Sequence, residues 1–153
     1  MANSRFVYVT YIRTTPEKLW QALIDPEFTR QYWCETWQDC EWKLGASWRL
    51  MIPDRRVGDS GEILEIEPHR RLVLSWRVEF QPALRAEGYS RLTYELEKER
   101  SSVKLTLIHE IEKTDSKLIE ATSGGWPQLL ASLKSLLETG EALEETRRWP
   151  EGI

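Results

Sequence analysis

Apolar and polar residues alternate along most of the middle of the chain. Between residues 72 and 80 every second side chain is apolar, while Ser75, Arg77 and Glu79 occupy the positions between them. This period of two predicts strands with one buried face and one wet face, as in an antiparallel sheet. An N-terminal segment rich in Val, Tyr, Ile and Thr adds a further strand. The predicted strands cover residues 6–13, 46–52, 62–67, 72–80, 90–97 and 103–111.

Two short helices are predicted directly after the first strand. Thr15-Pro16-Glu17 and Asp25-Pro26-Glu27 each combine a capping side chain, a proline and an acid, the signature of a helix start. The first helix is expected to end near Ile24 and the second near Tyr32. The following stretch, 33–42, is dense in Trp and acids and is compatible with a strand or a loop.

A longer helix closes the predicted fold. From Trp126 onward leucines recur at helical spacing, Pro127 suits the first turn, and Gly140 stands where a C-terminal cap belongs. Residues 116–121 read as a separate short helix, with Gly124-Gly125 as a bend before the long one. One strand, two short helices, an antiparallel run and a closing helix together predict a two-layer α+β fold.

Composition narrows the function classes. The 153-residue chain has the length of one domain and a formal charge of −4, which argues against a nucleic-acid-binding protein. No apolar run reaches the roughly 20 residues of a membrane-spanning helix, so no membrane span is expected. The N-terminus lacks a signal-peptide pattern, and two cysteines without an export signal are expected as free thiols in the cytoplasm.

A metal site is possible on paper but is not favoured. Cys34, Cys40, His69 and His109 supply the donor types of a Cys₂His₂ zinc site, yet the two cysteines lack the CxxC spacing. We interpret the four as unrelated residues and expect neither a metal nor a cofactor.

Three blocks of sequence resemble a known family. The first runs from Tyr11-Ile12 through Thr14-x-Pro16-Glu17-Lys18-Leu19-Trp20 to Asp25-Pro26-Glu27 and Tyr32-Trp33. The second is Gly61-Glu62-Ile63-Leu64 with the segment ending at Ser75-Trp76, and the third is Gly125-Trp126-Pro127 with the leucines up to Gly140. Over about residues 6–142 the chain is similar to bacterial proteins related to activators of the heat-shock-protein-90 ATPase, in the SRPBCC (START-like) superfamily.

The resemblance implies a helix-grip fold, in which a curved antiparallel sheet wraps round the long C-terminal helix, often with a cavity between them. It implies a single domain over residues 1–142 and leaves 143–153 as a C-terminal tail. It also suggests a chaperone as a partner. The superfamily hosts several functions, so the resemblance by itself defines no reaction.

Aromatic residues provide the candidate site. The chain has eight tryptophans, which either fill a core or line a pocket. The predicted inward rows and the closing helix place apolar and aromatic side chains face to face, with Trp33 near the expected mouth and His109 as a polar group. The candidate ligand-binding residues are Trp33, Trp48, Trp76, Tyr94, His109, Trp126, Leu130 and Leu133.

Three functions remain open at this point. The first is non-catalytic binding of a small hydrophobic molecule, against the simpler interpretation that the same residues pack a core. The second is a protein-interaction module acting on a chaperone ATPase. The third is a cyclase- or hydrolase-like enzyme with His109 as the base, although a lone histidine on an apolar row more often belongs to a core. The sequence carries no indication of the oligomeric state.

Overall fold

The computed structural model describes residues 3–151, which form one curved antiparallel sheet, a long helix and several short ones. The strands are β1 (Ser4–Ile12), β2 (Trp37–Cys40), β3 (Ser47–Met51), β4 (Val57–Glu67), β5 (Arg71–Val78), β6 (Ser90–Glu99) and β7 (Ser102–Ile111). The helices are α1 (Pro16–Ile24), α2 (Pro26–Tyr32), α3 (Pro82–Arg85) and α4 (Lys117–Thr139), followed by the 3₁₀ turn η1 (Glu144–Thr146).

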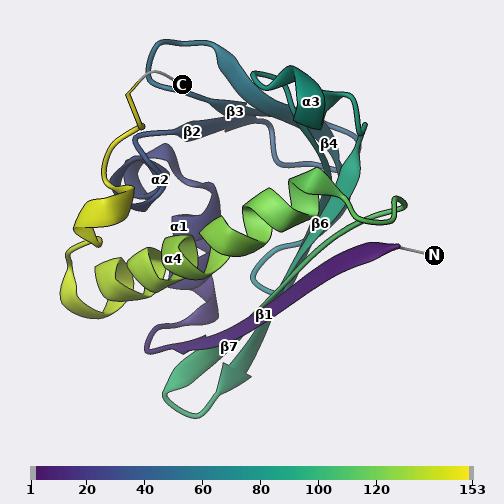
Figure 1. The fold of residues 1–153 in the computed structure, drawn as a ribbon. Coiled ribbons are helices and arrows are strands. Elements are labelled where there is room, and N and C mark those ends of the chain that lie inside the picture. Colours follow the sequence, from purple (N-terminus) through teal and green to yellow (C-terminus); the bar gives the residue numbers. More distant parts are fainter. Residues whose placement is uncertain (1–2, 152–153) are drawn as a thin grey trace.

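The seven strands lie in the order β1-β7-β6-β5-β4-β3-β2, and each adjacent pair is antiparallel. The sheet curves round α4, while α1 and α2 close one end of the fold (Figure 1). The strand register aligns Leu74, Leu92 and His109 across β5, β6 and β7. The fold is therefore the predicted helix-grip α+β architecture.

The starts of α1 and α2 confirm the predicted capping. The Thr15 hydroxyl accepts a hydrogen bond from the Lys18 amide at 3.2 Å, and the Asp25 carboxylate accepts one from the Glu27 amide at 2.9 Å. In each helix a proline follows the cap, where its missing N–H leaves no bond unmade.

The C-terminal helix differs from the prediction. The structure has one continuous 23-residue α4 instead of a short helix, a bend at Gly124-Gly125 and a second helix, so Pro127 lies inside the helix. The physical reason is burial at both ends. Leu118 and Ile119 pack against the ends of β5 and β7, and Trp126 onward packs into the main core. These contacts outweigh the weak helical propensity between them.

Two further boundaries were also wrong. Strand β4 begins at Val57, five residues before the prediction, and the predicted loop 81–88 contains the short helix α3. Gly58 and Gly61 interrupt the alternation of apolar and polar residues at the beginning of β4, so the pattern did not predict this part of the strand. The packing of β4 on β5 nevertheless requires a glycine at position 61. A Cβ atom on Gly61 would lie 1.8 Å from the Ser75 carbonyl oxygen of β5, so the two strands can approach only at a glycine.

The main core lies between the concave face of the sheet and the helices α1, α2 and α4. The Trp48 side chain is fully buried, and its indole N–H donates to the Gln38 side-chain oxygen at 2.9 Å. Gln38 in turn donates to the Leu23 carbonyl oxygen. The space between helix and sheet is thus filled by packed side chains around Trp48, whereas the pocket described below lies beside the middle of α4.

Candidate ligand-binding site

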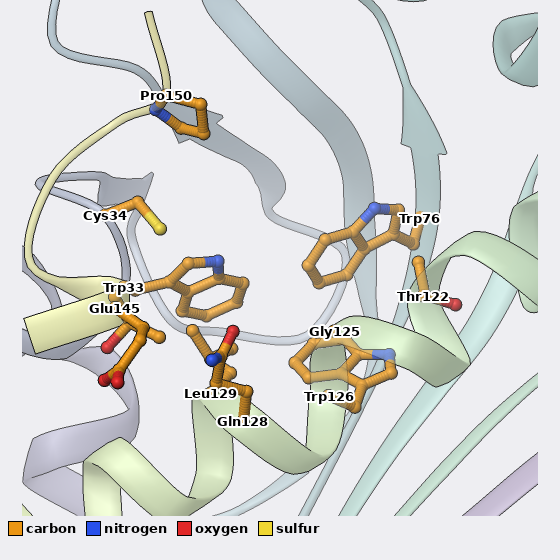
Figure 2. A pocket seen from close by; sticks show the side chains of 11 residues that line it. Trp33, Cys34, Trp76, Thr122, Gly125, Trp126, Gln128, Leu129, Glu145 and Pro150 are labelled. Atoms are coloured by element: carbon orange, nitrogen blue, oxygen red, sulfur yellow. The ribbon is translucent and has the colours of Figure 1, made fainter. Parts of the chain in front are cut away.

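A pocket of about 320 Å³, open to solvent, lies beside the middle of α4. Its volume is at the lower end of the range for small-molecule sites. The walls come from the end of α2, strand β5, helix α4 and the C-terminal segment (Figure 2). The lining residues are Trp33, Cys34, Trp76, Thr122, Gly125, Trp126, Gln128, Leu129, Glu145, Thr146 and Pro150.

Three indole rings from distant parts of the chain meet in this pocket. The Trp33 and Trp76 rings are nearly parallel, with an interplanar angle of 18° and centroids 5.8 Å apart. The Trp126 ring stands edge-on to both, at 5.7 Å from Trp33 and 5.6 Å from Trp76. Figure 2 shows the three rings pointing toward one another from the C-cap of α2, from β5 and from α4. We call this set the tryptophan cluster.

The polar edges of two of these indoles are fixed from behind. The Trp126 N–H donates to His109 Nδ1 at 3.1 Å, and the Trp76 N–H donates to the Asp59 carboxyl at 3.0 Å. Because both N–H groups are occupied by the protein, these two rings present carbon surface to the pocket. Trp33 has no such partner within residues 3–151.

The His109 side chain is fully buried and fully hydrogen-bonded. An indole N–H can only donate, so His109 Nδ1 must be the acceptor and Nε2 must carry the hydrogen. Nε2 donates to the Ser90 hydroxyl oxygen at 2.8 Å, and the Ser90 hydroxyl in turn donates to the Trp76 carbonyl oxygen at 2.9 Å. Burial lowers the pKa of His109 to about 4, so the ring is neutral at pH 7. This arrangement positions Trp126 and leaves no free nitrogen for a substrate.

Asp59 is the functional-site neighbour that sequence reasoning missed. It lies on β4 and is almost completely buried, and that burial raises the pKa of its carboxyl to about 7. The hydrogen bond from Trp76 acts in the opposite direction, and the nearby Glu79 raises the pKa further. In Val57-Gly58-Asp59-Ser60 only Val57 favours a strand, so this segment gives no periodic signal that would have drawn attention to Asp59.

The C-terminal segment forms one wall of the pocket. The Thr146 hydroxyl donates to the Ser132 hydroxyl on α4 at 2.6 Å, and the Thr146 carbonyl oxygen accepts from the Cys34 amide at 2.7 Å. Further along, the Trp149 ring packs edge-on against Phe80 at 5.4 Å. These contacts hold Glu145, Thr146 and Pro150 against the pocket, in a part of the chain outside the sequence blocks that carried the resemblance.

The sequence-predicted site residues fall into two groups. Trp33, Trp76 and Trp126 are buried in the core and also line the pocket, whereas the other five are buried without lining it. His109 contacts two of the lining indoles from behind. The core group consists of Trp48, Tyr94, His109, Leu130 and Leu133.

The cysteines and histidines do not meet. Cys34 and Cys40 are free thiols, and Cys34 alone lines the pocket. Within residues 3–151 no three His, Cys, Asp or Glu side chains are grouped as ligands of a metal would be. No helix in this part of the chain is long and apolar enough to cross a membrane.

The fold recurs in several solved structures. A protein from Mesorhizobium loti superimposes with a TM-score of 0.75 at 24% identity, covering 88% of this chain and 97% of that one. The Aha1 dimer from Colwellia psychrerythraea has a TM-score of 0.71 at 16% identity, covering 91% of this chain and 99% of that one. CalU16 from Micromonospora echinospora has a TM-score of 0.71 at 22% identity, covering 93% of this chain and 78% of that one. At these identities the likeness shows the fold alone.

A comparison with curated protein sequences gave no match. The family model described as "Activator of Hsp90 ATPase homolog 1-like protein" matches residues 13–138. The matched region runs from Arg13, two residues before the α1 cap Thr15, almost to the end of α4, and therefore covers most of the chain. The chain thus belongs to the family of Activator of Hsp90 ATPase homolog 1-like proteins, with the helix-grip fold of the SRPBCC type.

Proposed function

We propose that this protein binds a small, largely apolar molecule in the pocket beside α4, without transforming it. The observation that carries the proposal is the tryptophan cluster in the lining of an open pocket. Large aromatic rings contribute most when they are covered, and ligand pockets are lined mainly by apolar and aromatic side chains with a few polar groups.

The pocket has the polar groups that would orient such a ligand. The Cys34 thiol, the Gln128 amide and the Glu145 carboxylate lie among the lining residues. Burial raises the pKa of Cys34, followed by the effect of the neighbouring Glu35, so this thiol is protonated and unreactive at neutral pH. His109 is buried behind Trp126 with both ring nitrogens hydrogen-bonded, so the base that the enzyme hypothesis requires does not reach the pocket, which favours binding over catalysis.

A titration with the neutral, environment-sensitive dye Nile red tests the proposal. We expect saturable binding with a change in tryptophan fluorescence, and a several-fold weaker affinity in Trp33→Leu, because that ring forms a wall of the pocket. Trp37→Leu is the matched control, since Trp37 stacks on Arg30 and lies outside the pocket. Absence of saturable binding, together with no small molecule in native mass spectra of protein purified from cells, would rule the proposal out.

The family match supports a second candidate, an interaction with a chaperone ATPase. The corresponding experiment measures ATP turnover by the Hsp90 of the same organism with and without this protein. An unchanged turnover at saturating protein would remove this candidate and leave the ligand-binding proposal untouched. For either function we propose a cytoplasmic location, where the two free thiols would persist.

A further inference from the structure

The lining of the pocket carries one charge, and that charge is negative. Glu145 is the one charged residue among those that line it, and the described residues offer its carboxylate no hydrogen bond or ion pair. Its neighbour Glu144, in contrast, is paired with Arg147 at 3.2 Å. The Arg147 guanidinium also donates to the Ala142 carbonyl oxygen, and neither Arg147 nor Arg148 lines the pocket.

The groups behind the tryptophan cluster strengthen this bias. The Trp76 indole donates its N–H to the buried Asp59 carboxyl, and the Trp126 indole donates to the neutral ring of His109. Donation of an N–H to an acceptor polarises the indole and shifts electron density into its ring. Hence neither indole N–H has a positively charged hydrogen-bond partner, and the partner of the Trp76 N–H is a carboxyl.

The faces of electron-rich indoles attract cations. A positive group within about 6 Å of an indole centroid is stabilised by the ring quadrupole, and tryptophan is the most effective of the aromatic residues. Trp33, Trp76 and Trp126 pack mainly against one another and are 4–9% exposed, and the part of each indole that lines the pocket is the surface that a cation could reach. An anionic ligand would instead meet Glu145 with no lysine or arginine in the lining.

We infer that the pocket selects molecules that join an aromatic or aliphatic body to a positively charged amine, either a protonated tertiary amine or a quaternary ammonium group. The body covers the tryptophan cluster and the cation lies toward Glu145. This inference rests on the proposed function and specifies its ligand class.

Three probes of matched size test the selection. Benzyltrimethylammonium and neopentylbenzene have the same shape and differ in one atom, the charged nitrogen or a carbon, and 3-phenylpropanoate carries the opposite charge. Titration calorimetry at low salt should show that the ammonium probe binds about tenfold more tightly than 3-phenylpropanoate. The affinity of the neutral probe should lie between those of the cation and the anion. Raising the salt should reduce the difference, because the pocket is open and charges there are screened.

Replacement of the Glu145 carboxylate by an amide of nearly the same shape tests whether its charge contributes to binding. Glu145→Gln should weaken benzyltrimethylammonium binding about threefold to fivefold and leave neopentylbenzene binding unchanged. Glu144→Gln is the matched control, because it removes an adjacent carboxylate that is already paired outside the pocket. Equal effects of Glu145→Gln on both probes, or equal affinities for the ammonium and carboxylate probes, would overturn the inference while leaving the binding function intact. Failure of all three probes and of Nile red to bind would overturn both.

Discussion

His109 and Asp59 are two buried titratable groups whose pKa values are displaced in opposite senses by the same cause, loss of hydration. Burial raises the pKa of Asp59 from 3.8 to about 7 and lowers that of His109 from 6.5 to about 4. The Asp59 contribution to stability is fully present below pH 3.8 and is lost as the pH rises through 7. The His109 contribution is fully present above pH 6.5 and is lost as the pH falls through 4. Between pH 4 and 6.5 a rise in pH therefore lowers the free energy of unfolding through Asp59 and raises it through His109.

Asp59→Asn should therefore leave only the His109 effect, an increase of the free energy of unfolding with pH. The asparagine oxygen can still accept the Trp76 N–H, but the group no longer titrates. Relative to the unchanged protein, the free energy of unfolding of the variant should increase by up to about 1.4 kcal/mol per pH unit between pH 4 and 7. Urea denaturation at pH 4.5, 5.5, 6.5 and 7.5 measures this difference. A difference that is constant over the series would mean that Asp59 is ionised throughout.

Gly61 offers a second prediction at the scale of a single residue. A methyl group there would overlap the Ser75 backbone, which cannot move without separating β4 from β5. We expect Gly61→Ala to lower the free energy of unfolding by about 3 kcal/mol or more. Gly45→Ala would be a poor control because of its positive φ, whereas Gly124→Ala meets open space. Denaturant unfolding should show Gly124→Ala equal to or more stable than the parent.

At the scale of elements, α4 is the most informative. Its N-cap is Ser116, its C-cap is Gly140 with φ of 88°, and it continues through Gly124, Gly125 and Pro127. The helix brings Thr122, Gly125, Trp126 and Leu129 to the pocket, so its continuity decides where the pocket wall lies. A helix that began at Pro127 would leave the Thr122 part of the wall undefined.

Pro127→Ala distinguishes the two possibilities. Inside a continuous helix a proline lacks one backbone hydrogen bond and crowds the preceding turn, so its replacement should stabilise the protein by about 1–3 kcal/mol. At a first helical turn, proline is favourable, and the same replacement would be neutral or destabilising. Thermal and urea unfolding of Pro127→Ala give the sign, and a loss of stability would contradict the continuous α4.

Across the whole molecule, the pocket depends on a contact between the C-terminal segment and α4. The Thr146 and Ser132 side chains are both buried, and the Ser132 hydroxyl also accepts the Leu143 amide at 2.9 Å. The segment bears two exposed arginines, Arg147 and Arg148, directly after this anchor. Release of the anchor would open one wall of the pocket without disturbing the sheet.

Thr146→Val removes the anchoring hydroxyl with little change of shape. The buried polar partner then loses a hydrogen bond, which costs about 1–2 kcal/mol locally. Tryptic cleavage after Arg147 or Arg148, followed by mass spectrometry, should be several-fold faster in this variant. Ser123→Ala is the control, because its hydroxyl bonds only within α4, to the Glu120 carbonyl oxygen. Cleavage at an unchanged rate in Thr146→Val would show that the segment is held by other contacts.

Much of the fold was predictable because its signals are local. Alternation along β5, β6 and β7 and the caps at Thr15 and Asp25 depend on residues within a few positions of each other. The errors arose where local preference and long-range packing disagree, at Pro127 and at the glycine-containing start of β4. There the burial of neighbouring side chains decided the backbone conformation.

The sequence by itself determined the element types, their order and the supply of large aromatic rings for an apolar interior. Tertiary structure alone decided which rings line a pocket and which fill the core. Trp48 and Trp76 share the same inward pattern, yet the register and curvature of the sheet bury Trp48 completely and place Trp76 beside Trp33, Trp126 and Asp59. These partners come from the C-cap of α2, from α4 and from β4, so their meeting depends on contacts between distant segments, which no periodicity along the chain encodes.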